Sequence, residues 1–330
     1  MKKNALFFVV ALMLAGCAGA DREVWRKASG GMWNTLYAVT YRSEHQLDDS
    51  IVATMHRVEM ALSPFQPQSL ISRINRGESD ARADAMVRRV FAASKHVSEL
   101  SGGMFDPTVA PLINYWGFGY ASADSLSLDS VMARVGICDC DIAADGVVKK
   151  KHPATEFNFS AITKGYGCDA VGEMLRRNGC TDFLVEIGGE ISASGASPRG
   201  GSWRVMVDAP TDCSDSIVHD GMLTLEIADC GVATSGNYRN YRLTEQGKVS
   251  HTINPRTGRP VTLDRSDTTV LSATVVAHTA MEADALATAA MLLPPHEAEM
   301  MIKRAGAFRL ILALRTPTDS LTVRIWPRDE

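Results

Sequence analysis

Two oxygen-bearing side chains stand four residues apart late in the chain, at Asp284 and Thr288. They fall in the segment from Ala280 to Leu293, which is predicted to be a helix, so both oxygens point from one face. A carboxylate plus a hydroxyl suits a hard cation such as Mg²⁺, which accepts few protein ligands and bridges substrate phosphates. Polar pairs at this spacing are also common on solvated helix faces, so the pair by itself leaves both interpretations open.

A second group of reactive side chains surrounds Lys164. The chain passes from an extended stretch at Asn158 into a helix predicted from about Thr163 to Asn178, with Gly179 as its stop. A helix N-terminus presents free N–H groups and positive potential to an anion, and Lys164 would add a charge. An ordinary helix capped by Thr163 explains the same residues, so anion binding is one of two interpretations.

Glycines and aromatic side chains gather in the run from Ser101 to Thr108 and again at 114–119. Glycine lets a ligand approach the backbone, and aromatic rings offer flat surfaces, although a core cluster beside a turn is the commoner explanation. Gly188-Gly189, between two glutamates, and the polar stretch 233–238 are weaker signals, because such sequences usually mark turns or bulges. His251 is a candidate base, although a lone histidine is more often a structural hydrogen-bonding group.

The elements that must position these groups predict an α+β fold. Helical periodicity also covers 51–62 and 82–100. Strands and helices do not alternate regularly, which favours α+β over a doubly wound parallel sheet, and we expect one compact unit in one lobe or two. The predicted strands are Phe183–Ile187, Trp203–Val207, Leu223–Ile227, Thr269–Val276, Phe308–Leu314 and Leu321–Trp326.

The N-terminus has the pattern of an export signal. Lys2 and Lys3 precede an apolar stretch from Ala5 to Ala15 that is too short to span a bilayer. Leu14-Ala15-Gly16-Cys17 then predicts a bacterial lipobox, in which Cys17 is lipidated and becomes the new N-terminus. A plain secretory signal is the alternative.

This pattern sets the expected layout and location. We expect a signal peptide over residues 1–16, a lipidated N-terminus and tether over 17–30, and the folded domain over 31–330. The mature chain would be anchored in the bacterial cell envelope through the lipid on Cys17, facing the periplasm or another extracytoplasmic space.

Composition limits the function classes. The 330 residues are 45% hydrophobic and 22% charged, with 34 basic and 38 acidic side chains, which excludes a disordered chain and a coiled coil. A net charge of −4 without a basic run argues against nucleic-acid binding. The sequence has no Walker A loop, no G-x-G-x-x-G after a strand, no G-x-S-x-G and no H-E-x-x-H, so any nucleotide site uses another architecture. The six cysteines after Cys17 are expected to be buried or loosely paired thiols.

Taken in order, these segments resemble the ApbE-like family of FAD:protein FMN transferases. The resemblance runs from Met32 to about Leu293, and many members of the family are exported lipoproteins. It rests on Met32, Ser63-Pro64-Phe65 with 69–75, Gly102 to Thr108, Trp116 to Gly119, Ala161 to Tyr166, Gly188-Gly189, Ala233 to Tyr238, Ser250-His251 to Gly258, and Glu282 to Thr288.

The resemblance implies a T-fold-like α+β architecture that binds FAD without a Rossmann domain. The family moves the FMN half of FAD onto a Thr or Ser hydroxyl of a target protein and releases AMP. The implied Mg²⁺ ligands are Asp284, Thr288 and the carbonyl of Ala161, and His251 is the candidate for accepting the hydroxyl proton. Matching positions imply that FAD is held by Met32, Phe65, Met104, Phe105, Asp106, Asn158, Lys164 and Ile253.

The implied partners are FAD and the flavin-acceptor domains of membrane redox complexes or other FMN-carrying exported proteins. Two alternatives stay open: an Mg²⁺-dependent FAD pyrophosphatase that yields FMN and AMP, and a non-catalytic FAD-binding lipoprotein. Several positions depart from the family pattern. Asn158 stands where an acidic residue is common, Phe65 where Tyr is frequent, Trp33-Asn34 where Gly-Thr often follows the Met, and Ala287 lacks a carboxylate that some members place near the metal.

Overall fold

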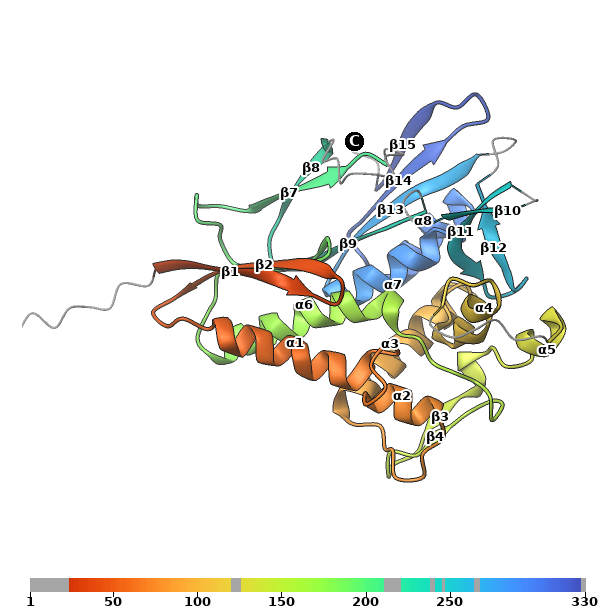
Figure 1. Cartoon of the computed structure of the whole chain (residues 1–330). Coiled ribbons are helices and arrows are strands. Elements are labelled where there is room, and N and C mark those ends of the chain that lie inside the picture. The colour runs from red at the N-terminus through yellow and green to blue at the C-terminus, as the bar shows by residue number, and fades with distance from the viewer. Residues whose placement is uncertain are drawn as a thin grey trace, which may run out of the picture.

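The structure, a computed structural model, describes residues 24–119, 126–210, 221–237, 241–244, 247–263 and 268–327 (Figure 1). The expected signal peptide and Cys17 lie outside these residues. Within the described part of the chain, no helix has both the length and the apolar character needed to cross a bilayer.

An eight-stranded, fully antiparallel sheet organises the fold. Its strands follow the order β1-β2-β5-β6-β9-β13-β14-β15, so the chain adds strands from one edge to the other. The α+β prediction is therefore confirmed. The strands are β1 (Val24–Met32), β2 (Thr35–Ser43), β5 (Phe183–Ile187), β6 (Glu190–Ser194), β9 (Cys230–Gly236), β13 (Thr269–Ala277), β14 (Arg309–Arg315) and β15 (Leu321–Trp326).

Helices cover one face of this sheet, and a β-hairpin contributes to the other (Figure 1). The helices are α1 (Asp48–Leu62), α2 (Leu70–Asn75), α3 (Ala85–Leu100), α4 (Ala110–Tyr115), α5 (Leu128–Met132), α6 (Ser160–Arg177), α7 (Ala280–Ala290) and α8 (Pro295–Ala305), with 3₁₀ turns η1 (Pro107–Val109) and η2 (Ile137–Asp139). The hairpin of β7 (Trp203–Asp208) and β8 (Gly221–Ile227) packs apolar side chains against Ile191, Val232 and Ile311 of the sheet. Two small sheets complete the fold, one of β3 (Asp141–Ile142) and β4 (Val148–Lys149), the other of β10 (Tyr241–Thr244), β11 (Gly247–Asn254) and β12 (Arg259–Thr262).

The four predicted helices and six predicted strands are present, most with shifted ends, whereas Phe183–Ile187 and Leu321–Trp326 keep the predicted bounds. The helix expected from about Thr163 begins at Ser160, and Thr163 is not its cap, because the Thr163 hydroxyl donates to the carbonyl of Phe159 inside the first turn. Gly179, with φ +83°, follows the end of that helix as expected. The thiols of Cys140, Cys168, Cys180 and Cys230 are buried as expected, whereas Cys138 is exposed.

The first strand begins inside the range that was expected to be a tether. Residues 24–30, assigned to the tether, belong to β1, which pairs with β2 from Val24–Ser43 to Met32–Thr35. The folded unit therefore includes Val24. Polar and glycine residues make up most of this strand. It lies at the edge of the sheet, where a strand pairs with one neighbour only and needs few apolar side chains.

Candidate active site

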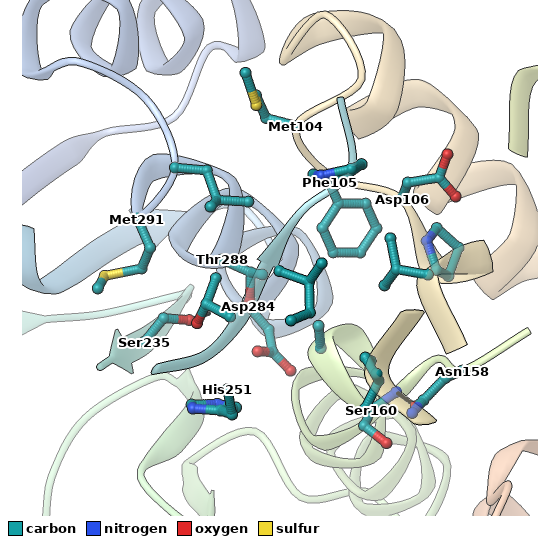
Figure 2. Close-up of a pocket in the computed structure, with 18 of the residues that line it drawn as sticks. Met104, Phe105, Asp106, Asn158, Ser160, Ser235, His251, Asp284, Thr288 and Met291 are labelled. Atoms are coloured by element: carbon teal, nitrogen blue, oxygen red, sulfur yellow. Dashed lines mark hydrogen bonds between the residues drawn. The ribbon is translucent and has the colours of Figure 1, made fainter. Parts of the chain in front are cut away.

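A cavity of about 480 Å³ lies where α6, α7 and β11 meet the loop before η1 (Figure 2). This volume falls within the range of small-molecule sites. All but one of the predicted site residues line it. They are Phe65, Met104, Phe105, Asp106, Asn158, Ala161, Lys164, His251, Ile253, Asp284 and Thr288.

Met32 is the exception. It ends β1 and packs, partly buried, against the cluster around α1 and α6 instead of lining the cavity. The turn it begins still comes close, since Thr35 lies beside Gly188, which in turn lies beside the stem of Lys164.

The floor of the cavity is the crossing of α6 and α7. The backbone N–H of Gly165 donates to Asp284 Oδ2 at 3.0 Å. A Cβ at residue 165 would lie only 2.2 Å from the carbonyl oxygen of Ala280, so the helices approach this closely only because residue 165 is glycine. Asp284 is buried, and burial raises its pKa, although the ammonium of Lys164 and the Gly165 N–H act in the opposite direction.

Thr288 lies one turn after Asp284 on α7, as its spacing predicted. Its Oγ1 lies 3.1 Å from the Oγ of Ser235 on β9, so two hydroxyls stand beside the buried carboxylate. Figure 2 shows Ser235, Thr288 and Asp284 as neighbours on one side of the cavity. Oxygen donors of this kind fit a hard cation.

The ammonium of Lys164 donates a hydrogen bond to Glu190, the first residue of β6. Glu190 is only 2% exposed, and among the described residues no donor reaches its Oε2. Burial raises the pKa of Glu190 to about 8, although the ammonium lowers it. Burial disfavours the charged form of Lys164, but Glu190 and Asp284 outweigh this and raise its pKa. One ammonium thus faces two buried carboxyl groups.

His251 enters the cavity from β11. Figure 2 shows His251 and Ser160 on either side of the Asp284 carboxylate. The strand is held near the end of β9, because the Thr252 hydroxyl donates to Asn237 Oδ1 at 2.6 Å. His251 is therefore held where it faces the cavity, on a strand outside the main sheet.

The opposite wall comes from the loop before η1. Asp106 accepts from the N–H and hydroxyl of Thr108 through Oδ1 and from the N–H of Ile137 through Oδ2. Because both oxygens bind within the protein, we expect Asp106 to meet a ligand through its backbone. Asn158 joins this loop to α6, since its N–H donates to Pro107 and its Oδ1 accepts from Ser160.

The sequence model of the ApbE family matches residues 33–312 of this chain. The chain belongs to the ApbE family. The predicted resemblance is confirmed, and it covers most of the chain, including every residue that lines the cavity.

Relatives and solved structures agree with this assignment. The chain is 31% identical to the FAD:protein FMN transferase of Vibrio cholerae over 92% of this chain and 91% of that protein. It is 28% identical to the enzyme of the same name from Salmonella typhimurium over 92% and 90% of the two chains. The flavinyl transferase ApbE of Pseudomonas stutzeri, in its apo form, superposes with a TM-score of 0.78 and 27% identity over 92% of this chain and 95% of that one.

Three residues in or beside this ApbE-family site were not singled out from the sequence. Glu190 was noted only beside a Gly-Gly pair, Ser235 only as part of a polar turn, and Asp169 not at all. Glu190 offered one local signal, because a carboxylate opens the otherwise small and apolar strand β6. Ser235 and Asp169 offered none, since their partners lie 53 and at least 111 residues away.

Proposed function

We propose that this protein transfers the FMN half of FAD to a Thr or Ser hydroxyl of a partner protein, with Mg²⁺, and releases AMP. The observation that carries the proposal is the cavity itself. It joins Asp284, Thr288, Lys164 and His251, which come from separate segments, in a family whose relatives are named FAD:protein FMN transferases.

The charges of the cavity suit the pyrophosphate of FAD. The Lys164 ammonium lies beside the N-terminal turn of α6, which is the positive end of the helix dipole. Phe105, Met104 and Ile253 give an apolar wall for a flavin or adenine ring, and Phe65 adds an exposed ring. Anion-binding and ring-binding surfaces therefore lie in one cavity.

The residues present also fit a divalent cation. Asp284, Thr288 and the Ala161 carbonyl are hard oxygen donors on two crossing helices. In a regular helix the Gly165 N–H donates to the Ala161 carbonyl. Here this N–H donates to Asp284, so the Ala161 carbonyl at most shares it. Mg²⁺ held by these residues would neutralise charge on the pyrophosphate oxygens.

In the transfer, the acceptor hydroxyl oxygen forms a bond to the phosphorus of the FMN half, and the bond from that phosphorus to the bridging oxygen breaks. AMP leaves with that oxygen and its electron pair. His251 accepts the proton of the hydroxyl, and Lys164 offsets the charge on the phosphates. The nucleophile is the hydroxyl of the acceptor, so water in its place would give FMN and AMP.

The location and the acceptors follow from the sequence. A lipid on Cys17 would hold the enzyme in the cell envelope, facing the periplasm or another extracytoplasmic space. The acceptors would be flavin-carrying domains of membrane redox complexes, or other exported FMN proteins, in the same compartment.

The deciding experiment is the intact mass of an FMN-acceptor domain after incubation with the protein, FAD and Mg²⁺, with free flavins quantified in the same tube. A mass gain of one FMN that EDTA abolishes supports the transferase. Accumulation of FMN and AMP with an unmodified acceptor means a pyrophosphatase. Intact FAD and an unmodified acceptor mean a binding protein.

A further inference from the structure

Asp169 is a buried carboxylate on α6 that binds the first turn of α7. It is 6% exposed, and its two oxygens accept the backbone N–H groups of Ala280 at 3.0 Å and Met281 at 2.8 Å. Burial raises the pKa of Asp169 to about 6, although these two N–H groups lower it. A buried carboxylate carries a large desolvation cost, which the two charge-assisted bonds at a helix N-terminus offset.

Two matching rows of residues meet where α6 crosses α7. Ala161, Gly165 and Asp169 lie four residues apart on α6, and Ala280, Asp284 and Thr288 lie four apart on α7. The contacts are reciprocal. The carboxylate of Asp169 binds the backbone of α7, and the carboxylate of Asp284 binds the backbone of α6 at Gly165.

The same turn of α7 has no room to shift. A Cβ on Gly165 would lie 2.2 Å from Ala280 O, and one on Gly231 of β9 would lie 2.1 Å from Ala280 N. The backbone of Ala280 is therefore enclosed between a helix and a strand. Asp169 adds two hydrogen bonds to this close packing.

We propose that Asp169 is a positioning residue for the cation site. It fixes the rotation of α7 and its position along the helix axis relative to α6, and thereby the distances of Asp284 and Thr288 from the Ala161 carbonyl. The inference rests on the proposed function in so far as these three groups hold Mg²⁺. Ligands from two elements bind a cation well only when the elements are held in one register, and partners of such ligands typically change metal affinity 10–100-fold.

The chain offers a matched control at the same helix end. The Thr279 hydroxyl accepts the N–H of Glu282 at 3.1 Å, a cap hydrogen bond that lies within the first turn of α7. Thr279→Ala removes an ordinary N-cap, whereas Asp169→Asn removes one acceptor and the charge that join the two helices. Both changes lower the stability of α7, but only Asp169→Asn removes contacts that fix α7 against α6.

The test uses the full-length protein and Mn²⁺ as a spectroscopic probe of the Mg²⁺ site, titrated with FAD present and absent. We expect Asp169→Asn to raise the Kd for Mn²⁺ about tenfold or more, and Thr279→Ala to change it less than about twofold. Hydrogen exchange, measured without metal, should quicken across 280–288 in Asp169→Asn and only around Glu282 in Thr279→Ala. Equal Kd changes in the two variants, or none in Asp169→Asn, would overturn the inference.

A second variant guards against misfolding. If Asp169→Asn is not recovered folded, Asp169→Ser, which is smaller and keeps one acceptor, takes its place with the same criteria.

The behaviour of the wild type separates the positioning role of Asp169 from the proposed function. A wild type that modifies the acceptor while Asp169→Asn binds Mn²⁺ normally overturns only the positioning role. A wild type that neither binds Mn²⁺ nor transfers FMN overturns the proposed function, while the exchange data still report whether Asp169 holds α7.

Discussion

The floor and the mouth of the cavity are built in opposite ways. At the floor, α6 and α7 approach until a single Cβ at residue 165 would clash, and buried carboxylates bind backbone N–H groups across the crossing. We call the side of the cavity around the loop before η1 and Phe118 its mouth. There Arg256 donates to the Gly102 carbonyl at 2.6 and 3.1 Å, and the Arg242 guanidinium lies over the ring of Phe118, which lines the cavity. These contacts use long, exposed side chains.

The difference separates two tasks. A reaction at a pyrophosphate needs ligands and charges held to within fractions of an ångström, which the packed floor provides. A protein acceptor must reach the reacting phosphorus, and a wall joined by flexible side chains can adjust to it. We therefore expect floor substitutions to change kcat and the metal dependence, and mouth substitutions to change apparent affinities.

The largest effect should follow a change at the floor. Asp284→Ala should lower kcat on the order of 10³-fold while FAD binding changes far less, because charge neutralisation matters most when the phosphate bonds rearrange. Single-turnover kinetics over a range of Mg²⁺ concentrations, with the Kd for FAD from flavin fluorescence, measure both quantities.

Asp284→Asn is the matched control for this change, since its amide oxygen can still accept the Gly165 N–H. Loss of turnover in both variants, with unfolding midpoints near that of wild type for the asparagine variant, assigns the effect to the carboxylate charge. Full activity in Asp284→Asn would remove Asp284 from the cation site.

His251 sits on the wall between floor and mouth, and its loss should be the next largest effect. His251→Ala removes the proton acceptor and should lower kcat about 10²-fold, with partial recovery when imidazole is added. His296→Ala, an exposed histidine on α8, is the control and should leave kcat unchanged. A His251→Ala enzyme of normal kcat would exclude histidine as the base.

The sequence predicted the elements that have a local pattern, and it did not predict those that depend on distant pairings. Local patterns located the four long helices and six of the strands, and the bounds of Phe183–Ile187 and Leu321–Trp326 agree in full. Strands such as β6 and β9 gave no such pattern, because they are buried on both faces and rich in Ser, Gly and Ala. Their places depend on pairings between distant segments.

The site was predictable in part for a related reason. The spacing of Asp284 and Thr288 follows from helix geometry alone, whereas the meeting of α6, α7 and β11 was reached only through the family resemblance. Neither helix geometry nor the family resemblance singled out Asp169 and Glu190. In the sequence, a carboxyl group that binds a distant backbone or ammonium cannot be told from an acidic residue on the surface.

Glu190 links the floor to protein stability. Its pKa lies at about 8 in the fold against an ordinary value of 4.5, so the native state keeps a proton that the unfolded state releases between these values. The free energy of unfolding should therefore fall as pH rises through this interval, and Glu190→Gln should flatten the fall by up to about 1.4 kcal/mol per pH unit. Urea denaturation in EDTA at several pH values measures it. Parallel pH profiles for the two proteins would show that Glu190 is ionised throughout.

The smallest effect belongs to the mouth. Phe65 is 63% exposed although it lines the cavity, so its ring is placed for a ligand and adds little to the core. Phe65→Ala should raise the KM for FAD about fivefold, the amount that one aromatic contact provides, with kcat and the unfolding midpoint unchanged. Met300→Ala on α8, 56% exposed and outside the cavity lining, is the control. A fall in kcat for Phe65→Ala, with KM unchanged, would place Phe65 with the floor and break the division between the two regions.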